Sequence, residues 1–211
     1  MNRLEIDVYS DFVCPWCFIG SRRLQAAVES FDHPDVVTRH HPYVLYPNVP
    51  ADGIDLRASL AQRYGQSPER LFAPVEAAGR QAGLALDFSR VRRVYSTVDA
   101  HTLARHAQPK GTTATFVDAV FNAYFLEGRN IASRDVLSDI AVRHGFIRAE
   151  TLALLDDVGE RRLTLDAAGQ AMKSGVKGVP LYVMNGRETV SGAHAPFVFT
   201  AAIERALASV A

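Results

Sequence analysis

The sequence has 211 residues but only two cysteines, Cys14 and Cys17, and this scarcity excludes several kinds of site. A zinc site with four thiolate ligands needs a second cysteine pair, which the sequence does not contain. In a reducing compartment, a lone pair at CxxC spacing is typical of redox catalysis or metal binding rather than of a structural disulfide. We therefore take Cys14 and Cys17 as the candidate reactive centre.

The sequence also has no formal net charge at pH 7. Lys and Arg together number 23, as do Asp and Glu. A balanced sequence has no electrostatic footprint for nucleic acid or for an anionic membrane surface, so we expect neither partner. Hydrophobic residues make up 48% of the chain, which is enough to fill a substantial core.

No long apolar run is present. Met1 leads directly into Arg3, Glu5 and Asp7, without a stretch of the length that a signal peptide or a membrane span requires. We therefore expect the protein to act in the cytoplasm. The sequence also shows no internal repeat and no low-complexity segment.

The segment around the cysteines reads as the start of a helix. If Cys14 is the N-cap, Pro15 occupies the first helical position, where its missing N–H costs nothing and its fixed φ suits the helix. We expect the free amides of that turn to point at the Cys14 sulfur and, with the helix dipole, to favour a thiolate. Cys17 follows one turn later, at a spacing that permits a disulfide with Cys14.

The rest of the pattern predicts a mixed fold. Alternation predicts a strand over residues 4–8. A helix from residue 14 to about 31 follows, ended by Asp32-His33-Pro34, and then a strand over residues 36–41. The segment from about residue 51 to 174 is typical of helices, and we expect them over these ranges: 55–64, 67–83, 97–107, 116–125, 133–145 and one through 167–174.

The chain then returns to strands. Residues 181–184 and 187–190 flank Asn185-Gly186, the dipeptide favoured in two-residue hairpin turns because both positions need a positive φ. A final helix is expected from about residue 196 to 207.

Two segments carry a resemblance to a known family. Cys14-Pro15-Trp16-Cys17 at a helix start, and Gly175-Val176-Lys177-Gly178-Val179-Pro180 before a hairpin, are similar to motifs of the thioredoxin superfamily. The large helical insertion, with the Asp99-Ala100-His101 segment, resembles DsbA-like oxidoreductases of the cytoplasmic FrnE-like branch. The similarity spans nearly the whole chain.

This resemblance implies an α/β protein, a thioredoxin fold with a large all-helical insertion. The thioredoxin-like domain is then discontinuous, comprising residues 1–50 and 160–211, and residues 51–159 form the inserted helical subdomain. Cys14 attacks the substrate, Cys17 resolves the mixed disulfide, and no bound cofactor is needed. The resemblance also implies that Pro180 is cis, and the backbone of Val179 beside it can pair with an extended substrate. Trp16 is interpreted either as a substrate contact or as an exposed aromatic at a helix start, and His101 is a further expected substrate contact.

The chain departs from the family at two points. Many superfamily members bury an acidic residue beneath the thiols as a proton relay, but Glu5 and Asp7 alternate away from the buried face of the first strand. The sequence therefore assigns no relay acid. His194 stands where the family suggests glutamine, and its role is open.

The histidines and aromatic residues allow simpler readings. His101 and His106 lie five residues apart, whereas helical metal ligands stand four apart, and we expect no metal site. The aromatic cluster between Phe116 and Phe125 is interpreted as core of the insertion, although its edge is suited to lining an apolar substrate cleft.

The leading hypothesis is a thiol-disulfide oxidoreductase that forms a mixed disulfide on Cys14. Its expected partners are disulfide- or thiol-containing proteins or small molecules, with glutathione as a candidate, and the oligomeric state is open. A glutathione-linked isomerase of a small aromatic substrate is one alternative, because a related branch does such chemistry with serine in place of the first cysteine. A peptide-binding holdase that uses the groove around Pro180 is the other.

Overall fold

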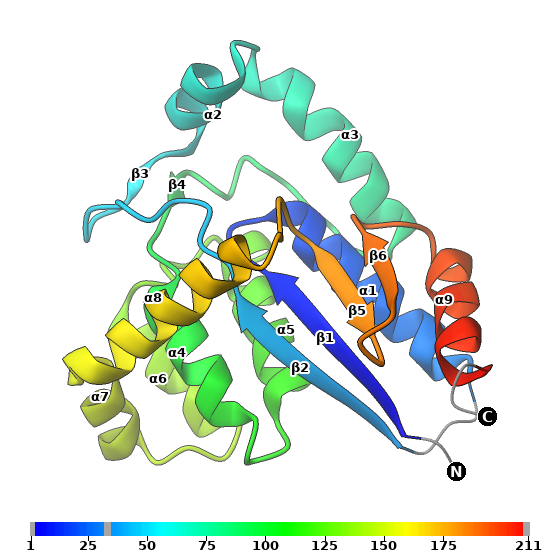
Figure 1. Cartoon of the computed structure of the whole chain (residues 1–211). Helices are drawn as coiled ribbons and strands as arrows, with labels where there is room; N and C mark the ends of the chain where they lie inside the picture. The colour runs from blue at the N-terminus through cyan, green and yellow to red at the C-terminus, as the bar shows by residue number, and fades with distance from the viewer. Residues whose placement is uncertain (1–2, 32–34, 209–211) are drawn as a thin grey trace.

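A four-stranded sheet organises the fold in the computed structural model, which describes residues 3–31 and 35–208. The strand order is β2-β1-β5-β6. β1 (Leu4–Ser10) runs parallel to β2 (Val36–Pro42) and antiparallel to β5 (Leu181–Met184), and β6 (Glu188–Ser191) pairs with β5 at the edge. Residues from the two ends of the sequence therefore build one sheet (Figure 1).

The alternation predicted for the first strand is confirmed in β1. Leu4, Ile6 and Val8 are buried and belong to the same apolar cluster as residues of α9. On β2, Arg39 donates two hydrogen bonds to Glu5, and the His41 ring nitrogen lies 2.7 Å from Asp7 Oδ1. Because these acids pair with the neighbouring strand, neither serves the cysteines.

Helix α1 (Pro15–Glu29) begins as expected, with Cys14 as N-cap and Pro15 in the first turn. It ends at Glu29, earlier than predicted, and Asp32-His33-Pro34 lie outside the described residues. Gly20 marks a close approach to the sheet, because a Cβ there would overlap the Tyr182 hydroxyl of β5. Only glycine therefore fits between this helix and β5.

The helical section lies between β2 and β5 and contains two short strands as well. β3 (Ile54–Asp55) and β4 (Arg93–Val94) pair antiparallel and were not anticipated by the sequence pattern. The helices are α2 (Leu56–Tyr64), α3 (Pro68–Gln81), α4 (Val98–Ala107), α5 (Thr113–Phe125), α6 (Arg134–Val142), α7 (Arg148–Asp156) and α8 (Val158–Lys173). In Figure 1, α2 and α3 form an arch on one side, while α4 to α8 gather on the other.

Two sequence expectations about this section need comment. α7 was not anticipated, and α8 begins at Val158, earlier than the predicted helix through residues 167–174. The domain division at residues 50/51 and 159/160 stays a prediction, and its second boundary falls inside α8. α8 also contacts β2, so the helical section packs directly on the sheet.

The C-terminal hairpin forms where the sequence predicts it, but its loop is one residue longer than the expected two-residue turn. Asn185 and Gly186 have φ values of 48° and 67°, and Arg187 completes the loop because Met184 pairs with Glu188. The backbones of Asn185 and Glu5 are also tied to one another, because Asn185 N donates to Glu5 O at 2.8 Å and Glu5 N donates to Asn185 Oδ1 at 2.8 Å. α9 (Pro196–Ala208) completes the chain.

The aromatic residues of α5 form the core of the helical section, as expected. Phe18 of α1 stacks on Phe121 at 5.2 Å and on Phe125 at 5.7 Å between ring centroids. This contact joins the cysteine-bearing helix to the insertion one residue beyond Cys17. Among the described helices, none combines the length and the apolar character needed to cross a membrane.

Candidate active site at the start of α1

Cys14 and Cys17 are both free thiols at the N-terminal end of α1. The loop from β1 is held by a turn in which Cys14 N donates to Asp11 O at 3.0 Å. Cys17 N then donates to Cys14 O at 3.0 Å, which sets the first helical turn. Local backbone hydrogen bonds between residues 11 and 17 therefore hold the main chain at both cysteines.

The Cys14 side chain does not cap the helix. No first-turn amide bonds to its sulfur among the described residues, contrary to the expectation from the sequence. Instead, Sγ lies 3.9 Å from the carbonyl oxygen of Val179, to which the thiol donates a weak hydrogen bond. The physical reason is that a neutral thiol is a donor and turns toward an acceptor, whereas a thiolate would favour the amides.

The Val179–Pro180 peptide bond is cis, the conformation that the family resemblance implies. Pro180 precedes β5, and Pro180 O accepts a hydrogen bond from Gly192 N at 2.8 Å, which ties this loop to the far end of the hairpin. Segments 165 residues apart in the sequence therefore meet at the Cys14 sulfur.

Cys17 lies deeper than Cys14. Cys17 is 1% exposed, against 6% for Cys14. Burial raises the pKa of the Cys17 thiol well above its ordinary value, and a hydrogen bond with the Cys14 thiol raises that pKa further. A backbone hydrogen bond with Asp11 lowers the same pKa, while the Asp11 carboxylate raises it. Losing the Cys17 proton therefore requires a nearby acceptor.

Asp11 is a buried acid that the sequence pattern did not assign to the site. It is 0% exposed, and its Oδ2 accepts a hydrogen bond from Leu45 N at 2.7 Å. Its other oxygen, Oδ1, is buried and has no hydrogen-bond partner among the described residues. The lone pairs of Oδ1 are therefore not used by any donor in the described part of the chain. The available signal was its place in the loop between the first strand and the cysteines.

His101 lies against this acid rather than at the surface. It is 4% exposed, and its Nε2 lies 3.5 Å from Asp11 Oδ1. That nitrogen has no hydrogen-bond partner in the described part of the chain. Its ring packs at 4.6 Å from Phe12. Substrate contact by His101 remains a prediction from the resemblance, and the structure places the residue beneath the loop that carries Cys14.

Two further polar side chains, His40 and Tyr182, line a second cavity of about 230 Å³. His40 of β2 has an Nδ1 without a partner among the described residues, and burial, followed by the charges of His101 and His41, lowers the pKa of His40 to about 3. The Tyr182 hydroxyl is likewise buried and unpartnered there. Burial, followed by the charges of Cys17 and Cys14, raises the pKa of Tyr182. Tyr182 therefore adds one more unpartnered polar group near the thiols.

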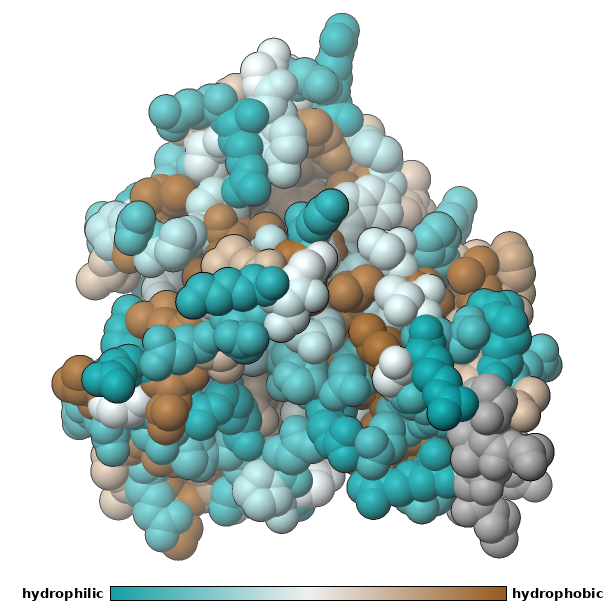
Figure 2. All heavy atoms as spheres, in the orientation of Figure 1, coloured by the Kyte–Doolittle hydropathy of each residue, from teal (hydrophilic) through white to brown (hydrophobic). Residues whose placement is uncertain are grey.

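The Cys14 side opens into a cavity of about 270 Å³. Its walls come from the cysteine turn, from α2 and α3, and from α5, and they are mostly aliphatic and aromatic. Trp16 lines it and is 38% exposed, so the indole stands at the boundary between cavity and solvent. Figure 2 shows hydrophobic residues around a hollow beneath the arch of α2 and α3.

His194 lies at the hairpin end rather than in this cavity. Its Nε2 is 2.9 Å from the carbonyl oxygen of Ser191, and the residue is exposed. The contact holds the chain after β6, where Arg23 Nη1 donates to Ala193 O at 2.6 Å. A structural role at this turn accounts for both contacts.

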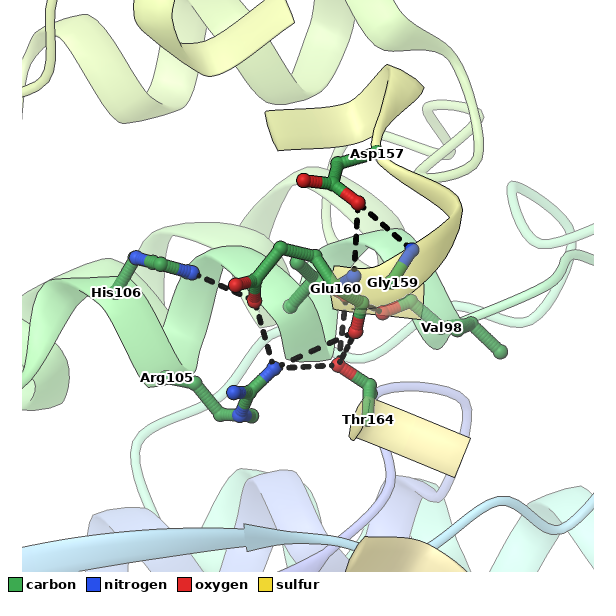
Figure 3. A network of polar contacts seen from close by, with 8 residues as sticks. Val98, Arg105, His106, Asp157, Gly159, Glu160 and Thr164 are labelled. Carbon is green, nitrogen blue, oxygen red and sulfur yellow. Dashed lines mark hydrogen bonds and ion pairs between the residues drawn. The ribbon is translucent and has the colours of Figure 1, made fainter. Parts of the chain in front are cut away.

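A second histidine of α4, His106, also faces a carboxylate. Its Nε2 lies 2.8 Å from Glu160 Oε2, and Arg105 Nη1 donates to the same oxygen at 3.1 Å. Figure 3 shows these side chains reaching from α4 to Glu160 and Thr164 of α8. Across the described ranges, no group of three or more His, Cys, Asp or Glu residues is placed to hold a metal ion.

The fold and this site define a class of protein. The model of the DSBA-like thioredoxin domain matches residues 5–204, so the chain belongs to the DSBA-like thioredoxin domain family. The fold class expected from the sequence, a thioredoxin fold with a helical insertion, is thereby confirmed. The assignment to the FrnE-like branch stays a prediction.

Three known proteins are similar over nearly their whole length. A probable DsbA oxidoreductase from Streptomyces coelicolor is 30% identical, with a TM-score of 0.87, over 98% of this chain and 91% of that one. The uncharacterised protein YwbO of Bacillus subtilis is 26% identical over 95% of this chain and 96% of its own. The fold is shared with the cytosolic disulfide reductase DsbM from Pseudomonas aeruginosa, solved with GSH, at 18% identity and a TM-score of 0.68 over 97% and 99%.

Proposed function

We propose that this protein is a thiol-disulfide oxidoreductase in which Cys14 attacks and Cys17 resolves. The observation that carries this proposal is the asymmetry of the two thiols. Cys14 lines the open cavity beside Trp16, whereas Cys17 is buried behind it. An incoming disulfide therefore meets the Cys14 sulfur first.

The chemistry proceeds through two exchanges. The Cys14 thiolate attacks one sulfur of the substrate disulfide, an S–S bond to Cys14 forms, and the other substrate sulfur leaves as a thiolate. Cys17 then attacks the Cys14 sulfur and releases the second substrate thiol. The substrate gains two electrons, and the protein is left with a Cys14–Cys17 disulfide. Run backwards, the same steps oxidise a dithiol.

Asp11 supports the second exchange as a proton acceptor. Cys17 has a raised pKa and lies beside the Asp11 carboxylate. Forming a thiolate next to an ionised carboxylate would place two negative charges in a buried site. Moving the proton from Cys17 to Asp11 keeps a single negative charge there. His101, 3.5 Å from Asp11 Oδ1, acts as the positioning residue for that carboxylate.

Substrate contact is assigned to the rim of the site. Trp16 offers an exposed aromatic surface beside Cys14, and the cis peptide brings the Val179 carbonyl to the sulfur. An extended peptide substrate would pair with this backbone next to Pro180, as in strand addition. His101 is too deeply buried for direct contact, and we assign it to the acid instead.

Glutathione is a candidate small-molecule partner, because the similar DsbM structure was solved with GSH and that protein is described as cytosolic. We propose a cytoplasmic location on the same basis, together with the sequence expectation. The glutathione-linked isomerase is disfavoured because this chain has both Cys14 and Cys17, whereas the isomerase branch has serine in place of the first cysteine. The holdase alternative predicts that neither thiol is needed.

The test uses two variants and three assays. Cys14→Ser should abolish insulin reduction while the protein stays folded, because serine suits an N-cap and is close in size. Cys17→Ser should accumulate mixed disulfides on Cys14, detected by mass spectrometry. Calorimetric titration with glutathione covers the isomerase alternative. Wild-type protein without disulfide exchange, combined with tight glutathione binding to Cys14→Ser, would overturn the oxidoreductase proposal.

A further inference from the structure

The cavity beside Cys14 has a composition that restricts what can enter it. Among the described residues that line it, Arg63 is the one charged side chain. Aromatic and aliphatic groups supply most of the remainder, including Phe72, Leu60 and Phe125. A cavity of about 150 Å³ with such walls holds a benzene ring. At about 270 Å³, this one has room for a substituted ring together with the sulfur that Cys14 would attack.

The same walls disfavour a polar guest. Glutathione carries two carboxylates, an ammonium group and two peptide groups, and each needs a hydrogen-bonding partner when it leaves water. Three tyrosines line the cavity, and one of them, Tyr124, already donates its hydroxyl to Arg93 O at 3.0 Å. The cavity therefore offers few polar partners for a glutathionyl group and many contacts for a ring.

Arg63 gives the cavity one polar end. It lies in the last turn of α2, with its guanidinium 5.3 Å from the Tyr46 ring and 5.8 Å from the Tyr64 ring. No carboxylate lies within ion-pair distance of it in the described part of the chain. Arg63 also borders the adjoining cavity of about 340 Å³ along α8, which shares Leu45 with the first. Its donors therefore remain free for an anionic group at the mouth.

We propose that this cavity binds the apolar arm of a small disulfide that carries an aromatic ring and a carboxylate, with the carboxylate at Arg63 and the reacting sulfur at Cys14. This inference rests on the proposed oxidoreductase function. Cys14 forms an S–S bond with the ring-bearing sulfur as the substrate disulfide breaks, and the second arm leaves as a thiolate. Cys17 then displaces the ring-bearing thiol, so the substrate takes up two electrons and the protein becomes oxidised.

The experiment compares three disulfides on the fully reduced protein in stopped flow. Dithiobis(nitrobenzoate) is aromatic and anionic, dithiodipyridine is aromatic and neutral, and glutathione disulfide is polar. Each rate constant is divided by that of the same disulfide with N-acetylcysteine, which removes intrinsic reactivity. We expect both aromatic disulfides to exceed glutathione disulfide by at least about tenfold after this correction, since burying a ring removes apolar surface from water.

Three variants separate the parts of the proposal. Leu60→Gln should lower the corrected rate for both aromatic disulfides. Arg63→Gln should lower it about fivefold for the anionic one alone, because a partly exposed charge pair is modest in strength. Arg70→Gln is the matched control, since Arg70 is exposed on the neighbouring helix α3 and does not line the cavity.

Each outcome bears on a different claim. Equal corrected rates for all three disulfides, or no effect of Leu60→Gln, would overturn the apolar cavity as the binding site. Equal losses in Arg63→Gln and Arg70→Gln would overturn the carboxylate contact in favour of long-range attraction. Rapid insulin reduction without any preference among the small disulfides would replace the small molecule with a protein substrate. Folded wild-type protein that reacts with none of them would refute the oxidoreductase function itself.

Discussion

Two histidines of helix α4 each face a carboxylate, and the two contacts differ in distance, in solvent exposure and in hydrogen bonding. His106 meets Glu160 at 2.8 Å, with side-chain exposures of 32% and 20%. His101 stands 3.5 Å from Asp11, with side-chain exposures of 4% and 0%. Glu160 receives a further hydrogen bond from Arg105, whereas Asp11 Oδ1 has no partner among the described residues.

The difference separates a structural contact from a chemical one. Around Glu160, hydrogen bonds from α4 are complete, and Thr164 Oγ1 connects Arg105 and Thr102 in the same network (Figure 3). This network joins α4 to α8 by hydrogen bonds whose partners are all present, so we interpret it as structural. Asp11 interacts with the Cys17 thiol, and the facing atoms of Asp11 and His101 are left without hydrogen-bond partners among the described residues. Buried polar groups without partners cost stability, so their presence beside the thiols favours a chemical role.

The largest expected effect comes from removing the acid. Asp11→Asn keeps an oxygen for the Leu45 amide but cannot take up the Cys17 proton. In stopped flow with dithiobis(nitrobenzoate), the first chromophore is released by Cys14 and the second by Cys17. The second phase should slow about 100-fold near neutral pH, the lower range for loss of a general base. It should recover steadily as pH rises, because hydroxide then removes the proton.

Glu160→Gln provides the matched control for that measurement, because it removes the carboxylate that faces the other histidine. It should leave both phases unchanged. A second phase in Asp11→Asn with the wild-type rate and pH profile would contradict the role of the acid. If this variant does not fold, a solvent isotope effect on the second phase of wild-type protein tests the same proton transfer.

The folding stability of the protein should depend on pH through His40. Its folded pKa of about 3 lies below the ordinary value of 6.5 because the ring is partly withdrawn from water, and the charges of His101 and His41 lower it further. Below about pH 6.5 the unfolded chain therefore binds a proton that the folded chain does not. Stability is complete above that value and falls as pH drops toward 3, by roughly 2 kcal/mol for a partly exposed side chain.

Urea unfolding of wild-type protein and His40→Phe at pH 7, 5 and 4 measures this term. The wild-type protein should lose more stability than the variant on acidification, since phenylalanine does not titrate. His194→Asn serves as control, because His194 is exposed at the end of the hairpin. Parallel pH curves for wild type and His40→Phe would show that His40 is not held neutral by the fold.

Local patterns in the sequence predicted most of the fold. The alternation of Leu4, Ile6 and Val8 and the Asn185-Gly186 turn are decided within a few residues, and the structure follows both. The boundary between α7 and α8 was missed because Asp157 acts at once as the C-cap of one helix and the N-cap of the next. Gly159 follows two residues later, but it lies inside the first turn of α8, where its amide donates to Asp157 Oδ1, so it does not mark the break.

The candidate site was only partly accessible from the sequence. Cys14, Cys17 and Pro180 belong to motifs whose spacing carries their chemistry. The contact of Asp11 with His101 spans 90 residues and depends on how α4 packs under the cysteine loop. Residue order contains no signal for such an approach. The same holds for Arg63, which reaches the cavity only because α2 arches over it.

A smaller kinetic effect is expected from His101 than from Asp11, because the imidazole acts through the carboxylate. His101→Gln should slow the second phase about tenfold and His106→Gln should leave it unchanged, which compares two positions on one helix. An effect confined to protein stability, with the second phase and its pH profile intact, would assign His101 to packing against Phe12 alone.

The smallest expected effect concerns the satisfied pair. Hydrogen bonds from His106, followed by the charges of His106 and Arg105, lower the pKa of Glu160, whereas burial alone would raise it. A lowered carboxyl pKa contributes stability that is complete above the ordinary value and lost as pH falls through the folded value. Glu160→Gln should therefore reduce the free energy of unfolding by about 1 kcal/mol at pH 7, as expected for a partly exposed network. The gap from wild type should narrow at acid pH, where Glu160 takes up a proton and both side chains become neutral. An equal loss of stability at neutral and at acid pH would mean that Glu160 stabilises the contact between α4 and α8 by packing rather than by charge. The contrast with the buried Asp11–His101 pair would then rest on burial alone.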